Sequence, residues 1–285
     1  MSPATVARDE FIVRSNFQRE WIEGRGLWLL AAIYLGGVGG GLFIASVVFG
    51  WRLGLLIGLG IAIILKGGAH LLFLTRPMVF WRIFLRPQTS WISRGIYFVL
   101  LFAISGLAYY FIGGATLMAI SVFFAFCLII YTGFVLLASR PISFWNNPLL
   151  PILFVFVSLG SGISLMDTIQ AFSPQDILHR VLLEIAGPWV VSITALLILV
   201  YLAGNYYSSI AAKESVIYLV KGRLAPLFYT GVAFLGIILP LAILISAYFK
   251  VVPSSSLAVA GISELVGAFA LRYSILKAGI NAAVA

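Results

Sequence analysis

Long apolar runs, separated by short polar stretches, make up most of this chain. Each run has about 20 residues, the length that a helix rising 1.5 Å per residue needs to cross about 30 Å of hydrocarbon. The pattern predicts an all-α, polytopic membrane protein with about eight transmembrane helices. The predicted spans are residues 27–49, 53–74, 93–113, 116–138, 148–167, 183–203, 225–249 and 256–276.

Composition supports lipid as the solvent of these runs. Hydrophobic residues make up 62% of the chain and charged residues 9%, whereas soluble domains carry about 25% charged residues. We expect two four-helix bundles, with a polar segment at residues 1–26, the first bundle at 27–138 and the second at 139–285. Aromatic residues near the run ends are candidates for interfacial anchors or for packing against neighbouring helices. They include Trp51, Trp91, Trp145 and Tyr248.

The distribution of positive charge predicts the orientation. An even number of spans places both termini on one face. Of the 18 Lys and Arg residues, only Arg52, Arg180 and Lys250 fall on the opposite face, and Lys66 falls inside a span. The others, Arg272 among them, are assigned to the face of the termini, which is therefore predicted to be cytoplasmic in a plasma or cell inner membrane. The net charge of +9 thus reflects topology, and no nucleic-acid partner is expected.

The chain offers few ligands for a metal. Cys127 is the single cysteine, and His70 and His179 are the only histidines. The two histidines fall in segments predicted to lie near opposite faces, so one pocket cannot use both for haem. We expect no haem or metal in this chain.

A short motif occurs twice in the first half. Arg76-Pro77-Met78-Val79-Phe80-Trp81 follows the second predicted span, and Arg140-Pro141-Ile142-Ser143-Phe144-Trp145 follows the fourth, so the first four spans resemble two copies of a helical hairpin. Each copy is interpreted either as a membrane anchor or as a docking point for a peripheral subunit. The candidate docking residues are Arg82, Arg86, Arg94 and Arg140.

Glycine is concentrated within the first span, in Gly36-Gly37-Val38-Gly39-Gly40-Gly41. Small residues allow another helix or a flat ligand to approach the backbone closely. We expect close helix packing here.

Ionisable residues inside spans are costly unless they are paired or hydrated, so each is a functional candidate. Lys66 is predicted either to pair with a carboxylate such as Glu264 or to take part in a proton relay. Asp167 and Glu184 fall at span ends near the opposite face, either as solvated charges or as a proton entry point. The predicted proton pathway comprises Lys66, Asp167, Glu184 and Glu264.

Several polar residues of the first half are candidates for a quinone site. A buried phenol at Tyr131 needs a hydrogen-bond partner, which a neighbouring helix or a quinone carbonyl can supply. His70 can exchange a proton near neutral pH, as quinone chemistry requires, or it can bond a backbone carbonyl. Glu23 and Arg25, just before the first span, are either pocket-lining or exposed interfacial charges.

Together, these motifs resemble the NrfD/PsrC family, the membrane subunits of polysulfide-reductase-like and other molybdopterin oxidoreductase complexes. The segments that carry the resemblance are Thr75-Arg76-Pro77, Phe80-Trp81-Arg82, residues 87–95 (PQTSWISRG), Tyr131-Thr132-Gly133, residues 144–151 (FWNNPLLP) and Leu271-Arg272-Tyr273.

The resemblance implies a subunit that binds menaquinone or ubiquinone and exchanges electrons with an iron-sulfur, ferredoxin-like subunit, which is attached to a catalytic molybdopterin subunit. It assigns no catalytic residue to this chain, and it places Tyr131 at a quinone contact of the fourth helix. Trp28 and Ala31 stand where similar members carry Asn and His as quinone contacts. The pocket here is therefore expected to use Tyr131 with His70, Glu23, Arg76 and Trp28, unless quinone binding is lost.

Two alternatives remain open on the sequence. The chain is either a proton- or ion-translocating subunit that uses Lys66, Asp167 and Glu264 as a relay, or a membrane anchor without quinone. Proton transfer can also accompany quinone chemistry in the first interpretation.

Overall fold

The computed structural model describes residues 21–172 and 177–281, with the backbone alone described for 177–184. Within these residues the chain is helical and eight helices are long and apolar enough to cross a membrane. This confirms the all-α fold and the eight predicted spans. The observed ends lie within a few residues of the predicted ones, except that the sixth helix is extended at both ends, over Ile177–Ser208.

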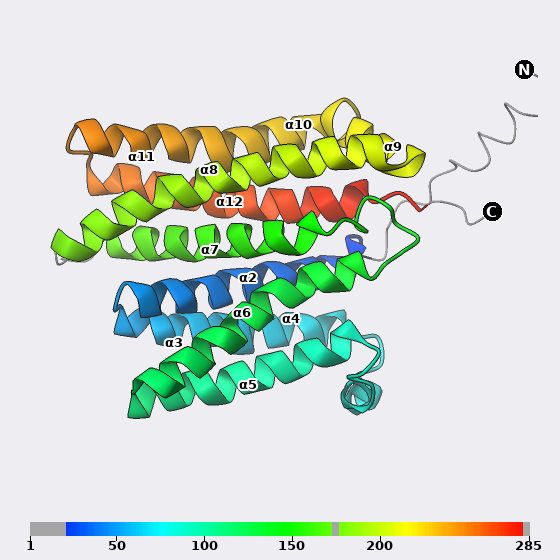
Figure 1. Ribbon diagram of the computed structural model, residues 1–285, viewed down its shortest axis with the longest axis horizontal. Helices are drawn as coiled ribbons and strands as arrows, with labels where there is room; N and C mark the ends of the chain where they lie inside the picture. The colour runs from blue at the N-terminus through cyan, green and yellow to red at the C-terminus, as the bar shows by residue number, and fades with distance from the viewer. Residues whose placement is uncertain (1–20, 173–176, 282–285) are drawn as a thin grey trace, which may run out of the picture.

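The first four spans form one side of the molecule, which we call the first bundle (Figure 1). The second span is a single continuous path through α3, η2 and α4, with a π-helical turn in its middle. The short 3-10 helix η3 lies on the end of the molecule that carries the termini. The bounds are α2 Gly26–Val48, α3 Arg52–Gly60, η2 Ile61–Leu65, α4 Lys66–Phe73, η3 Pro77–Leu85, α5 Trp91–Ile112 and α6 Ala115–Leu137.

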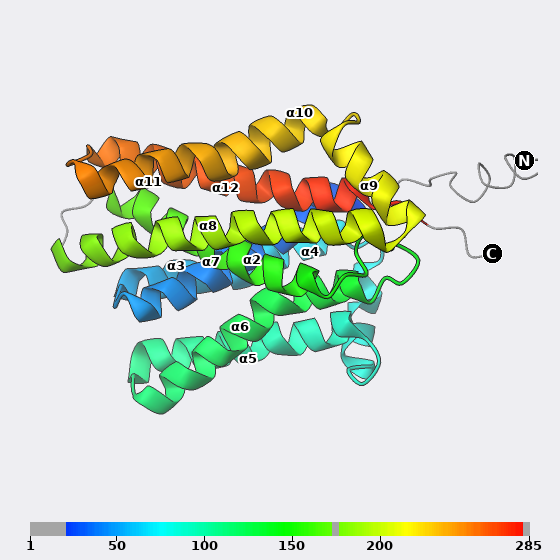
Figure 2. The ribbon, with the colours of Figure 1, turned by 45° about the horizontal axis from the view of Figure 1, so that its top comes forward.

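The last four spans form the other side, which we call the second bundle (Figure 1). The helix α9 leaves the end of α8 on the side of the termini and leads into the seventh span (Figure 2). The bounds are α7 Leu149–Gln170, α8 Ile177–Ser208, α9 Ile210–Val220, α10 Ala225–Leu227, η4 Phe228–Ile238, α11 Leu239–Phe249 and α12 Ser254–Ala278.

The glycines of α2 join the two sides. A Cβ on Gly39 would lie 2.6 Å from the backbone nitrogen of Ala62 in the second span. Gly41 of α2 and Gly162 of α7 lie backbone against backbone. Helices approach this closely only where side chains are absent. The prediction that the glycine run serves close helix packing is therefore confirmed.

The repeated Arg-Pro-x-x-Phe-Trp motif has two different environments. Trp81 of the first copy is 57% exposed, whereas Phe144 and Trp145 of the second copy are fully buried. The Trp145 indole donates a hydrogen bond of 2.8 Å to the carbonyl of Ile275 on α12. Trp145 is therefore a core residue and not an interfacial anchor, because the C-terminal half of α12 covers it.

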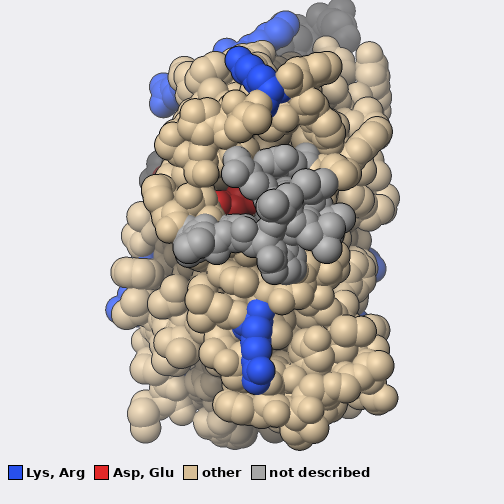
Figure 3. Space-filling model, turned by 90° about the vertical axis from the view of Figure 1, so that its left-hand side faces the viewer, with Lys and Arg blue, Asp and Glu red and all other residues tan. Residues whose placement is uncertain are grey.

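Among the residues that the structure describes, few cations lie at the end of the molecule away from the termini. Uncharged residues cover most of that face, with isolated Lys and Arg side chains between them (Figure 3). This agrees with the charge bias read from the sequence.

Candidate functional site

A buried lysine and a buried tyrosine meet between α4 and α6. Lys66 Nζ donates a hydrogen bond of 2.9 Å to Tyr131 Oη, and the same ammonium lies 5.4 Å from the centroid of the tyrosine ring. Only 4% of Lys66 and 8% of Tyr131 is exposed. Both groups lie about 10 Å inside the helix ends that face the termini, since seven residues separate Lys66 from the end of α4 and six separate Tyr131 from the end of α6.

Glycines on two other helices make room for this pair. A Cβ on Gly36 of α2 would lie 3.0 Å from the Lys66 side-chain carbons Cδ and Cε. A Cβ on Gly95 of α5 would collide with the ring of Tyr131. Phe98, also on α5, packs edge-on against the same ring at a centroid distance of 6.4 Å. Four helices of the first bundle thus fix where the ammonium and the phenol lie.

His70 lies one turn further along α4, nearer the face of the termini. Its Nδ1 is 3.2 Å from the backbone carbonyl oxygen of Lys66. A carbonyl can only accept, so this hydrogen bond places a proton on Nδ1, and in the neutral ring Nε2 is then the acceptor. The sequence left two roles open for His70, proton exchange or a hydrogen bond to a backbone carbonyl. The structure forms the backbone hydrogen bond through Nδ1, which leaves Nε2 for a second partner.

The other predicted quinone contacts lie towards the membrane surface. Trp28 is 46% exposed, and Arg76 is exposed just beyond α4. Glu23 forms an ion pair of 2.8 Å with Lys277 at the end of α12. Arg25 donates a hydrogen bond of 2.9 Å to the carbonyl of Leu74. These residues border the helix ends of α2 and α4, whereas Tyr131 and Lys66 lie deeper.

The predicted proton-pathway residues separate into two groups. Glu264 of α12 accepts a hydrogen bond of 2.6 Å from Ser164 Oγ on α7, in the second bundle. The pairing of Lys66 with Glu264 is therefore wrong, because each group has another partner on a nearer helix. Asp167 lies one turn beyond Ser164 on α7. Glu184 falls among the residues whose side chains lie outside the described part of the structure.

Arg272 is a buried cation that the sequence did not reveal. It was assigned to the cytoplasmic face, but only 1% of it is exposed. Nη1 donates to the carbonyl of Ala268 at 3.1 Å and Nη2 donates to Ser158 Oγ at 3.0 Å. The guanidinium carbon is 5.7 Å from the ring centroids of both Tyr34 and Phe154. The assignment was wrong because α2, α7 and α12 enclose this side chain six residues before α12 ends.

Of the four candidate docking arginines, three are exposed and one is bonded within the chain. Arg82, Arg86 and Arg140 are exposed on the face of the termini. Arg94 is instead bonded within the chain, where Nε donates to the carbonyl of Pro87 at 2.8 Å and Nη2 to that of Gln88 at 2.6 Å. Its guanidinium also lies 4.5 Å from the centroid of the Trp91 ring. Three of the four arginines are thus available to a partner on that face.

The eight apolar helices define a multi-pass helical membrane protein. Its first bundle contains a buried ammonium and a buried phenol. Residues 25–285 match the family described as polysulphide reductase, NrfD, and the chain belongs to this family. It is also similar to the C subunit of polysulfide reductase from Wolinella succinogenes, at 32% identity over 154 residues. That match covers 52% of this chain and 49% of the relative, so it spans about half the length of each.

Proposed function

We propose that this chain is the membrane subunit of a respiratory oxidoreductase complex, in which it binds a quinone or quinol in the first bundle. Electrons would pass between the quinone and an iron-sulfur partner subunit that is itself attached to a catalytic, molybdopterin-type subunit. Membership of the NrfD family supports a role in an oxidoreductase complex. The observation that carries the quinone proposal is the hydrogen bond between Lys66 and Tyr131 in the interior of the bundle.

The chemistry of this pair suits a quinone oxygen. The phenol oxygen accepts from the ammonium and keeps its own hydrogen, which it can donate to a quinone carbonyl. A quinone bound here would supply two-electron redox chemistry, and its reduction to quinol would need two protons, of which Tyr131 would donate one and the aqueous side would supply the other. The ammonium of Lys66 then stabilises the phenolate until a proton from the aqueous side replaces it. The partner would supply both electrons, and Tyr131 would return to its protonated state.

His70 gives a route for the replacement proton. It stands between Lys66 and the face of the termini, and its Nε2 is not the nitrogen that bonds the backbone. A neutral imidazole carries a donor at one nitrogen and an acceptor at the other, so it can relay protons between a pocket and solvent. Glu23, Trp28 and Arg76 would form the mouth of the pocket, and Arg82, Arg86 and Arg140 would contact the partner.

Tyr131→Phe tests this function. The variant removes one hydroxyl and keeps the ring that packs on Gly95. Because it also leaves the buried Lys66 without its hydrogen-bond partner, subunit assembly and melting temperature are measured beside turnover. We expect quinone-coupled electron transfer to fall by at least about tenfold, because a charge-assisted hydrogen bond is worth about 1.5–3 kcal/mol. Tyr248→Phe is the matched control, since Tyr248 is 53% exposed in the second bundle. Unchanged turnover in Tyr131→Phe would remove Tyr131 from the site.

Two other functions make different predictions. A proton or ion translocator that works without a redox partner should purify without an iron-sulfur protein. A membrane anchor that has lost quinone binding should purify with the partner but without quinone. Analysis of the subunits and lipids in the detergent-purified sample separates these functions from the proposed one.

A further inference from the structure

A carboxyl group lies inside the second bundle, outside the proposed quinone site. Glu264 Oε2 accepts from Ser164 Oγ at 2.6 Å. A Cβ on Gly160 would lie 2.5 Å from Oε1 of the same carboxyl group. The helix α7 therefore holds the carboxyl on both sides, with a hydroxyl donor at one oxygen and a glycine that makes room for the other.

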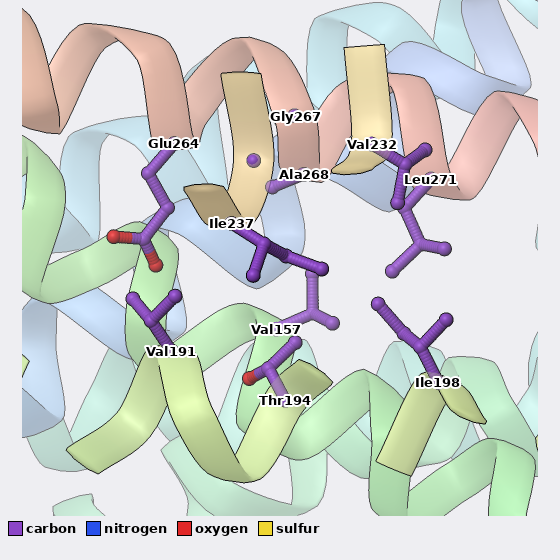
Figure 4. Close-up of a pocket in the computed structure, with 11 residues that line it drawn as sticks. Val157, Val191, Thr194, Ile198, Val232, Ile237, Glu264, Gly267, Ala268 and Leu271 are labelled. Atoms are coloured by element: carbon purple, nitrogen blue, oxygen red, sulfur yellow. The ribbon is translucent and has the colours of Figure 1, made fainter. Parts of the chain in front are cut away.

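A small cavity adjoins this carboxyl. It lies between α7, α8, η4 and α12, and Glu264 projects to its edge (Figure 4). Its volume is about 20 Å³, which is enough for one water molecule. Among the residues that line it, only Glu264 and Thr194 of α8 carry side-chain oxygens. A water in this cavity would have a carboxyl and a hydroxyl as polar partners, and the remaining walls are apolar.

Buried hydroxyls continue from this point along α7. Ser158, Ser161 and Ser164 recur every third residue, and each is at most 2% exposed. We call these three residues the serine row. Ser158 accepts a hydrogen bond from Arg272, and Ser164 donates one to Glu264. The two ends of the serine row thus contact two residues of α12, Ser164 at Glu264 and Ser158 at Arg272.

We propose that Glu264 is a proton-binding site in the second bundle and exchanges its proton with water in the adjoining cavity. This site is separate from the quinone pocket, because α2 lies between them. Gly36 on α2 contacts Lys66 of the first bundle, and Gly37 contacts Arg272 of the second. Glu264 would take up a proton on the carboxyl oxygen nearest the cavity and release it to the same water.

Among the residues whose side chains the structure describes, few other titratable groups lie near Glu264. On α7, Asp167 lies one turn beyond Ser164. On α12 itself, Arg272 is about two turns away, and on α2 the Tyr34 hydroxyl donates to the carbonyl of Leu265 at 3.2 Å. The lining residues from α8 and η4 are uncharged. A proton-dependent signal from this position should therefore belong to Glu264 and be influenced mainly by Asp167 and Arg272.

Infrared spectroscopy of the full-length protein tests the proposal directly. The carbonyl stretch of a protonated carboxylic acid is resolved from that of a carboxylate and shifts when the acid proton exchanges for deuterium. We expect an acid band that disappears as pH rises, shifts in D2O and is absent in Glu264→Gln. Glu264→Asp, which retains an acid, covers the case in which Glu264→Gln fails to fold.

Three outcomes would overturn the proposal. One is the absence of a Glu264 acid band at every pH, which would mean that the group does not bind a proton. Another is a band that does not shift in D2O, which would mean that water has no access. The third is a band that sodium removes at constant pH, which would assign the site to a metal cation.

Two further variants show whether the cavity carries the exchange. Thr194→Val removes the second polar partner of a cavity water and should slow the D2O shift by roughly tenfold. Thr230→Val is the matched control, because the Thr230 hydroxyl bonds the carbonyl of Pro226 on its own helix at an exposed position. Tyr131→Phe should leave the band unchanged, so failure of the quinone proposal and failure of this one give different results.

Discussion

The ammonium of Lys66 lies 2.9 Å from the phenolic oxygen of Tyr131, across the boundary between α4 and α6. The phenol is uncharged, so in an apolar interior it compensates the positive charge of Lys66 only in part. A third group that becomes negative beside the phenol would be stabilised by the same ammonium. This is why we place the quinone, whose oxygens become basic on reduction, next to this pair.

Lys66→Met removes the charge of the buried lysine and keeps a side chain of similar length. This removes the cost of holding an ammonium in an apolar interior, and the Tyr131 hydroxyl that stays behind is uncharged. We therefore expect an unchanged or higher melting temperature of the purified protein, together with quinone-coupled electron transfer that is about 10- to 100-fold slower. Lys213→Met, at an exposed position on α9, is the matched lysine and should keep the wild-type rate. A Lys66→Met protein with full activity would contradict a role for the ammonium.

The glycines around the pair predict a graded series. Gly95→Ala places a methyl group against the ring of Tyr131, which cannot move away easily, whereas Gly36→Ala meets only the flexible carbons of Lys66. Gly68→Ala meets nothing within 4 Å. We expect the loss of quinone affinity and of thermal stability to be largest for Gly95→Ala, smaller for Gly36→Ala and absent for Gly68→Ala. Equal effects at Gly95 and Gly68 would show that the ring position does not matter.

The sequence predicts the membrane fold well, for a physical reason. The span of a bilayer fixes helix length, so a run such as residues 225–249 is visible without any knowledge of its neighbours. The elements that the sequence did not predict, η3 and α9, are too short to carry that signal. The two copies of the Arg-Pro-x-x-Phe-Trp motif show the same limit, because only contact with α12 distinguishes buried Trp145 from exposed Trp81.

The site is less visible in the sequence. Tyr131, Lys66 and His70 were all singled out, but nothing in the sequence indicates that side chains of α4 and α6 meet. Counting residues from the helix ends places Lys66 and Tyr131 at nearly the same depth, and this comparison would have suggested the contact. Arg272 was missed because its position near a helix end resembles a surface cation, while the groups that bury it come from α2 and α7.

Arg272 should be important for the packing of α12 against α2 and α7. Arg272→Ala removes both hydrogen bonds of the guanidinium, and a hydrogen bond to a charged group is worth about 1.5–3 kcal/mol. A lysine cannot reproduce the flat guanidinium between Tyr34 and Phe154. We expect both Arg272→Ala and Arg272→Lys to lower the melting temperature of the protein in detergent. Arg140→Lys, at an exposed position, should not. A stable Arg272→Lys variant would show that only the charge is required.

The charge bias predicts the orientation of the chain in the membrane. After Cys127→Ser, single cysteines at Arg140 and at Lys250 should be labelled from opposite sides by a thiol reagent that does not cross the membrane. In intact cells we expect labelling at position 250 and protection at position 140, which becomes accessible once the membrane is opened. The reverse pattern would place the termini, and the arginines proposed for docking, outside the cytoplasm.

Photochemical crosslinking of a quinone tests the quinone site most directly. The purified complex is illuminated with an azido-substituted quinone, and the labelled peptides are identified by mass spectrometry. We expect the label on peptides of α4 and α6 that contain Lys66 or Tyr131, competition by unmodified quinone, and less labelling in Tyr131→Phe. Labelling confined to α7–α12, or equal labelling with and without competing quinone, would contradict a quinone held beside the tyrosine of the first bundle.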